Sequence, residues 1–241
     1  MTFCLGVKVQ EGLVGIADTL VTSGIEGITA RKVSIYQNGN HSMFLMTSGL
    51  RSVRDKALTY FDEVMDEKGD TFDRLFKAVN ALSDAIRRVA KEDARALKAS
   101  GLRFDINCLV GGQMEHDKEH KLYLVYPQGN WVEIGESTPY QIVGVGGYGK
   151  PILDRTLKYT DSMKFALKVG MLSFDSTRIS ATDVDFPVDV ILYREGTYKI
   201  IEHRFQKSDI GYVSDWWQEN LRQSVGNLPS DWVDVALNKL P

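Results

Sequence analysis

Apolar residues repeat every two positions in some stretches of this chain and every three to four in others, and the two patterns alternate in blocks. A period of two is typical of strands and a period of 3.6 of helices. Strands are predicted at 3–9, 12–18, 31–37, 41–47, 105–114, 121–126, 130–136, 188–194 and 199–205, and helices at 52–68, 70–100, 151–159, 162–175 and 214–240. Most strands follow one another through short turns, such as Asn38-Gly39, which favours antiparallel sheets. The segment 21–29 is predicted to be a loop, and Asp70 or Thr71 to cap the second helix.

This order of elements favours one architecture. Each antiparallel sheet has one face to cover, and each helix pair has one face to bury. The economical solution is an α+β fold in which two sheets pack face to face with a helix layer outside each, a four-layer α/β/β/α sandwich. We expect a single domain over 1–241 with a helical tail from about 208 to 241, whose tryptophans form either core or, as we favour, an interface.

Composition excludes several classes of protein. With 29 basic and 32 acidic residues in 241, the formal net charge is -3, which argues against a nucleic-acid or anionic-membrane partner. Cys4 and Cys108 are the two cysteines, so no disulfide framework is indicated and a cytoplasmic location is expected. No apolar run is long enough to span a membrane, and no leader peptide is visible.

Neither a metal nor a cofactor is expected. His116 and His120 lie in a segment predicted to be a hydrophilic turn, with no third ligand nearby. The glycine-rich segment 144–149 lacks the Lys-Ser/Thr ending of a phosphate-binding loop and the acidic residue of a dinucleotide site. Close backbone packing explains its glycines better.

Thr2 is the first candidate for chemistry. An initiator methionine followed by a small residue is generally removed, and its loss would leave a threonine with a free α-amine beside its hydroxyl. Such a residue holds nucleophile and base together, and an α-amine with a pKa of about 7.7–8.0 is partly neutral at cytosolic pH.

The first hairpin places an acidic residue beside Thr2. If Gln10-Glu11 is a two-residue turn, the numbers of opposed residues sum to 21, and Thr2 lies opposite Thr19, next to Asp18. A carboxylate at the end of so apolar a strand needs a partner, and Lys32 is the candidate. A Lys32–Asp18 pair would hold positive charge near the Thr2 hydroxyl and favour its ionised form.

Several segments resemble known proteins. The layout of proteasome β-subunits is similar to Thr2-Phe3-Cys4-Leu5-Gly6, Gly15-Ile16-Ala17-Asp18-Thr19, Arg31-Lys32-Val33 and Met46-Thr47-Ser48-Gly49. A closer resemblance, to the bacterial Anbu (ancestral β-subunit) family, comes from Tyr148-Gly149-Lys150-Pro151-Ile152-Leu153-Asp154-Arg155, Leu172-Ser173-Phe174-Asp175-Ser176-Thr177 and Phe186-Pro187-Val188-Asp189.

This resemblance implies the N-terminal-nucleophile hydrolase fold and a set of site residues. The nucleophile would be Thr2, tuned by Asp18 and Lys32, and the backbone N–H of Gly49 would bind the oxyanion. The implied reaction is amide hydrolysis through an acyl-threonine ester. One departure is Val145, which stands where proteasome subunits carry a serine that helps to position the N-terminal amine.

Three hypotheses for function follow from the sequence. The first is a self-assembling threonine peptidase that forms a ring or an open helical assembly and acts on peptides or unfolded proteins. The second is a proteasome-like scaffold with little or no peptidase activity, which Val145 favours. The third is a small-molecule amidohydrolase on the same fold.

Overall fold

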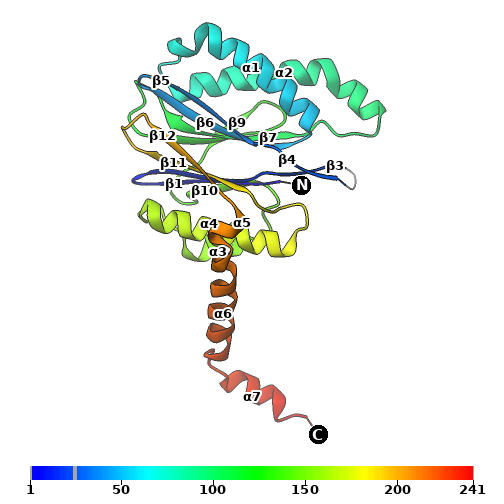
Figure 1. The fold of residues 1–241 in the computed structure, drawn as a ribbon, viewed down its shortest axis with the longest axis vertical. Coiled ribbons are helices and arrows are strands. Elements are labelled where there is room, and N and C mark those ends of the chain that lie inside the picture. The colour runs from blue at the N-terminus through cyan, green and yellow to red at the C-terminus, as the bar shows by residue number, and fades with distance from the viewer. Residues whose placement is uncertain (1, 24–25, 241) are drawn as a thin grey trace. The chain divides into compact units, whose positions relative to one another are not determined.

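The computed structural model describes residues 2–23 and 26–240 (Figure 1). The chain divides into two compact units, one ending at Gln206 and the other beginning at Lys207. Among the described residues, the first unit holds both large sheets, four α-helices and a short 3-10 helix (Gly69–Thr71), and the second unit is the helical tail. No helix in the described part of the chain is long and apolar enough to cross a membrane.

Two five-stranded antiparallel sheets form the body of the first unit. The first sheet has the order β10-β1-β2-β11-β12 and the second β5-β6-β7-β8-β9, while β3 and β4 form a separate hairpin. The strands are β1 (Phe3–Val9), β2 (Gly12–Asp18), β3 (Leu20–Ser23), β4 (Glu26–Thr29), β5 (Val33–Asn38), β6 (His41–Gly49), β7 (Ile106–Gln113), β8 (Lys121–Val125), β9 (Trp131–Glu133), β10 (Tyr140–Gly144), β11 (Val188–Arg194) and β12 (Ile200–Phe205).

A pair of helices covers the outer face of each sheet (Figure 1). Apolar residues of α1 (Arg51–Lys68) and α2 (Leu75–Ala99) pack on the second sheet, and α4 (Met163–Ser180), with α3 (Lys150–Thr156) beside it, lies against β1 and β2. The four-layer α/β/β/α sandwich predicted from the sequence is confirmed. The tail consists of α5 (Lys207–Ile210), α6 (Tyr212–Gly226) and α7 (Asp231–Leu237).

The core between the sheets holds the site strand in place. Every residue of β1 and β2 is buried. Their side chains contribute to an apolar cluster with the facing strands, which includes Cys4, Leu13, Phe44, Met46, Leu109 and Ile191. Burying an apolar side chain of this size contributes about 1.5–3 kcal/mol. Strand β1 is therefore fully buried and is paired on both sides, by β10 and by β2.

The first hairpin has the register that the sequence predicts. Cys4 pairs with Ala17 and Val9 with Gly12, so that opposed numbers sum to 21 and Gln10-Glu11 form the turn. Asp18, the last residue of β2, consequently lies opposite Phe3 and one residue from Thr2.

Four local predictions differ from the structure. The segment 21–29 is mainly the β3–β4 hairpin rather than a loop, although residues 24 and 25 lie outside the described residues. The β5–β6 turn consists of Gly39 and Asn40, because Asn38 still pairs with His41. Strand β10 was not predicted. Helix α2 begins at Leu75, beyond the predicted caps, and Asp117 caps it from a distant loop by accepting from the Leu75 N–H at 2.9 Å.

Candidate active site

Thr2 is held through its own backbone. It is half-buried, and its carbonyl oxygen accepts a hydrogen bond of 2.7 Å from the Val145 N–H. Gly144 of β10 pairs with Phe3 of β1 and has a φ of +91°. A Cβ at this position would lie 1.9 Å from the Thr2 carbonyl oxygen. The close approach therefore requires glycine, as expected for a segment that packs by its backbone.

Asp18 and Lys32 form the predicted pair directly beside Thr2. The Lys32 Nζ donates to Asp18 Oδ1 at 2.6 Å and to the Leu20 carbonyl oxygen at 2.7 Å. The same Asp18 oxygen accepts the Phe3 N–H at 2.8 Å, so the carboxylate also fixes the peptide that follows Thr2. The register of β1 and β2 places Asp18 beside Thr2, and Lys32 lies directly before β5.

Burial controls the charge of this pair. The Asp18 and Lys32 side chains are 0% and 2% exposed. Loss of solvent raises the pKa of Asp18 to about 6, although the Lys32 ammonium and the hydrogen bonds that Asp18 accepts oppose the rise. Its second oxygen, Oδ2, has no hydrogen-bond partner among the described residues. The arrangement keeps an ammonium group in a dry environment beside the carboxylate that holds the peptide following Thr2.

Gly49 ends strand β6 in a conformation that favours glycine. Its φ is +126°, and a Cβ would come within 2.3 Å of the Asp105 carbonyl oxygen. The preceding residue, Ser48, lies close to the Thr2 region, because its Oγ is 3.3 Å from the point where a Gly144 Cβ would be. Strand β6 thus reaches the edge of the site from the opposite sheet. Ser48 was not predicted to lie near the site, although its position next to Gly49 could have indicated this.

Val145 and the polar residues of α4 lie in the part of the first unit where the resemblance places the residues that position the amine in proteasome subunits. Val145 contributes its N–H to Thr2 and carries no hydroxyl. On α4, Asp175 is mostly buried and pairs with Arg178 at 2.8 Å, whereas Ser180 is exposed at the end of the helix. Ser173, two residues before Asp175, has a buried hydroxyl with no hydrogen-bond partner among the described residues.

The two cysteines and His120 are buried in the body of the first unit. Cys4 and Cys108 are free and buried, and burial raises the pKa of both thiols. His120 is fully buried and not in a hydrophilic turn, because its Nε2 and Nδ1 contact the Val9 carbonyl oxygen at 2.9 Å and Glu195 at 3.2 Å. Within residues 2–23 and 26–240, no group of three or more His, Cys, Asp or Glu side chains could hold a metal ion.

Comparison with solved structures identifies close structural neighbours. An Anbu (Gly-1) mutant from Hyphomicrobium sp. strain MC1 is 27% identical, with a TM-score of 0.88 over 95% of this chain and 98% of that one. The helical assembly of the Anbu complex from Pseudomonas aeruginosa is 26% identical, with a TM-score of 0.88 over 95% and 97%. Anbu from Yersinia bercovieri, 24% identical, has the same fold with a TM-score of 0.86 over 94% and 97%.

No family model matches the chain, and no curated protein matches it. Assignment therefore depends on structure together with sequence segments. The structural likeness extends over nearly the whole of both chains, and it agrees with the segments that resemble this family. The chain has the N-terminal-nucleophile hydrolase fold of the Anbu proteasome-like proteins, and the structural likeness and the sequence segments together support the Anbu family.

Proposed function

We propose that this chain is a self-assembling threonine-type amidohydrolase that cleaves peptide bonds with Thr2 as its nucleophile. The observation that carries the proposal is the buried Lys32–Asp18 pair, 2.6 Å long, attached by a hydrogen bond to the peptide that follows Thr2. Burying two charges is costly. A solvent-free ammonium beside a candidate nucleophile is the kind of arrangement found at functional sites.

The proposed reaction begins once Thr2 is the first residue. Its neutral α-amine takes the hydroxyl proton while the oxygen attacks the substrate carbonyl carbon, and the Lys32 ammonium favours the developing alkoxide. The backbone N–H of Gly49 stabilises the oxyanion, an interaction typically worth about 10²–10³ in turnover. The proton then passes to the leaving amine as the C–N bond breaks and an ester to Thr2 remains. Water cleaves that ester and returns the hydroxyl.

Self-assembly is the second part of the proposal. It is supported by the related complex from Pseudomonas aeruginosa, which forms a helical assembly. The substrate class we propose is a peptide or an unfolded protein chain. Electron microscopy of the purified chain would distinguish a closed ring from an open helical assembly.

A covalent probe tests the catalytic part. Intact-protein mass measures whether the initiator methionine is removed. A peptide epoxyketone then reports on hydroxyl and amine together, because it needs both to close a ring on an N-terminal threonine. We expect one adduct on Thr2 of the processed protein and none on Thr2→Ala. Retention of the methionine, or the absence of an adduct on processed protein, would contradict the proposal.

The second candidate is an assembly protein with little or no peptidase activity. Val145 favours it, because the valine side chain cannot donate or accept a hydrogen bond where proteasome subunits use a serine hydroxyl. Val145→Ser separates the two candidates. A gain in the rate of epoxyketone capture in this variant would mean that the amine of the natural protein is poorly positioned.

A further inference from the structure

The loop between β10 and α3 carries the hydrogen bond that holds the Thr2 carbonyl group. It spans residues 144–149, and its Val145 N–H donates to the Thr2 carbonyl oxygen at 2.7 Å. Four of these six residues are glycine, so the backbone of the loop has wide conformational freedom of its own. The place of the Val145 N–H therefore depends on how the two ends of the loop are anchored.

Glycines at both ends let the loop pack closely on its neighbours. A Cβ on Gly144 would lie 1.9 Å from the Thr2 carbonyl oxygen. A Cβ on Gly149 would lie 2.2 Å from the Ser173 hydroxyl oxygen of α4. The loop is thus fitted between Thr2 and α4, and a shift of either flanking element, β10 or α3, would move the Val145 N–H.

A cluster of three side chains joins the two elements that flank this loop. The Tyr140 hydroxyl of β10 donates to Asp154 Oδ1 of α3 and accepts from the Lys150 Nζ at 2.8 Å. The same Nζ donates to both Asp154 oxygens, at 2.7 and 2.8 Å. Tyr140 is buried and pairs with Val7 of β1, so its ring is fixed in the sheet. The cluster therefore ties α3 to the edge strand of the first sheet.

The order of the charges in α3 indicates that they serve this connection. At a spacing of four residues a helix favours the acidic residue before the basic one, with acidic groups near its N-terminus. Lys150 instead begins α3, and Asp154 follows four residues later. Their side chains are 55% and 46% exposed, and an exposed pair by itself contributes little to stability. The hydrogen bonds from Lys150 and Tyr140 lower the pKa of Asp154, so its carboxylate is ionised at neutral pH.

We infer that the Tyr140–Lys150–Asp154 cluster positions Thr2. By fixing α3 on β10 it fixes both ends of the loop 144–149, and the loop holds Thr2 through the Val145 N–H. The three side chains are positioning residues, because they act on Thr2 through the loop. The inference rests on the proposed function, since the residue that is positioned is the proposed nucleophile.

Tyr140→Phe tests the inference by removing one hydroxyl group. Hydrogen exchange over residues 144–149, followed by mass spectrometry, reports on the Val145–Thr2 contact and requires no activity. Exchange should become faster and epoxyketone capture at saturating probe slower, each by about fivefold, the change that corresponds to one ordinary hydrogen bond. The probe concentration that gives half-maximal capture should not change, because the cluster acts on the nucleophile and not on the probe.

Tyr36→Phe is the matched control in the second sheet. The Tyr36 hydroxyl of β5 donates to Asp62 Oδ1 of α1 at 2.6 Å, so this variant also removes a hydroxyl that joins a strand to a helix. It should lose stability as Tyr140→Phe does. Its exchange over 144–149 and its capture rate should match those of the unmodified chain.

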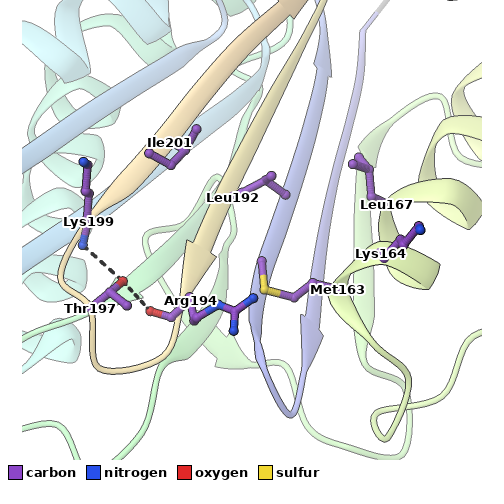
Figure 2. Close-up of a pocket in the computed structure, with 8 residues that line it drawn as sticks. All are labelled: Met163, Lys164, Leu167, Leu192, Arg194, Thr197, Lys199 and Ile201. Atoms are coloured by element: carbon purple, nitrogen blue, oxygen red, sulfur yellow. Dashed lines mark hydrogen bonds between the residues drawn. The ribbon is translucent and has the colours of Figure 1, made fainter.

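Thr197→Val is a control in the first sheet itself. Figure 2 shows the Thr197 hydroxyl beside a pocket of about 520 Å³, where it donates to the Arg194 carbonyl oxygen at 2.7 Å. This place is remote from Thr2, because Arg194 pairs with Gly12, at the opposite end of β2 from Asp18. The variant should leave both readouts unchanged.

Exchanging the charges tests whether the three groups act together. Asp154→Lys leaves the Tyr140 hydroxyl between two ammonium groups and without its acceptor, so capture should slow as in Tyr140→Phe. Adding Lys150→Asp restores one carboxylate and one ammonium group beside the hydroxyl, and most of the rate should return. The exchanged order is the one that a helix favours, so a failure to recover would not come from loss of α3.

The outcomes separate this inference from the proposed function. Unchanged exchange and capture in Tyr140→Phe, equal losses in Tyr36→Phe, or no recovery in the charge-exchanged variant would each overturn the inference and leave the proposed function standing. If the unmodified chain is never captured, the proposed function fails. The exchange rates over 144–149 then still decide whether the cluster holds Thr2 in place.

Discussion

Replacing Lys32 with methionine removes the cation that pairs with Asp18 among the described residues and keeps a side chain of similar length. Asp18 would retain the Phe3 N–H on Oδ1, and its Oδ2 already has no hydrogen-bond partner among the described residues. A fully buried carboxylate would be left without a countercharge. Its pKa should rise further, since the Lys32 charge and hydrogen bond are what lower it now.

The size of the effect follows from burial. Breaking a buried ion pair by removing one partner typically costs about 3–5 kcal/mol. Proteins have free energies of unfolding of about 5–15 kcal/mol, so Lys32→Met would remove a large part of the stability. At about 2–4 °C per kcal/mol for a chain of this size, the melting temperature should fall by roughly 6–20 °C.

Urea denaturation followed by circular dichroism measures this change. The matched control is Arg51→Met, which breaks the exposed Arg51–Asp55 pair, whose side chains are 55% and 50% exposed. Exposed pairs contribute about 0–1 kcal/mol, so the control should lose little. The denaturant midpoint of Lys32→Met should fall with an unchanged slope.

A second substitution makes the reasoning refutable. Asp18→Asn combined with Lys32→Met leaves no uncompensated charge, and the amide oxygen can still accept the Phe3 N–H. The double variant should therefore recover most of the lost free energy of unfolding. If the single variant is as stable as Arg51→Met, or if the double variant is no more stable than Lys32→Met, the buried charge is not what stabilises this region.

Two further predictions follow from the same region. Gly144→Ala should destabilise the chain by several kcal/mol and abolish capture of a threonine-directed electrophile, because the alanine Cβ would overlap the Thr2 carbonyl oxygen. The control Gly146→Ala should be tolerated, because the nearest atom to its Cβ would be 3.4 Å away. Thermal melts and capture rates of the two variants test this prediction. The pKa of Asp18 in the folded chain, about 6, lies above its ordinary value of 3.8, so between these pH values the folded chain keeps a proton that the unfolded chain releases. The contribution of Asp18 to the free energy of unfolding should therefore decline as pH rises from about 4 to 6. Asp18→Asn should remove that slope from urea titrations across this range, and capture at the site should fall as pH drops below about 6 in the unmodified chain, because the ionised Asp18 that anchors Lys32 is then lost.

Features fixed by short-range chemistry were predicted well. A two-residue turn determines the register of a hairpin, so counting from Gln10-Glu11 was enough to place Asp18 opposite Phe3. Lys32 was identified because a carboxylate at the end of an apolar strand needs a partner. These two residues lie together in the structure as predicted.

Features that depend on distant parts of the chain were not predicted. The start of α2 is set by Asp117, more than forty residues later, and no local pattern carries that information. Strand β10 is short and lies at an edge, so it shows little alternation, and its role emerges only through its pairing with β1. Ser48 comes close to Thr2 only because the two sheets pack face to face.

Lys32 belongs to both halves of the sandwich at once. Its backbone carbonyl oxygen accepts the Thr47 N–H of β6 at 3.2 Å, while its ammonium group is held by Asp18 of β2 in the other sheet. Any sliding of one sheet over the other would pull directly on this side chain. The geometry of the Asp18–Lys32 pair therefore depends on how the two sheets pack. A substitution that loosens the sheet interface, such as Met46→Ala, should change the rate of electrophile capture at Thr2 under conditions in which the chain is still folded.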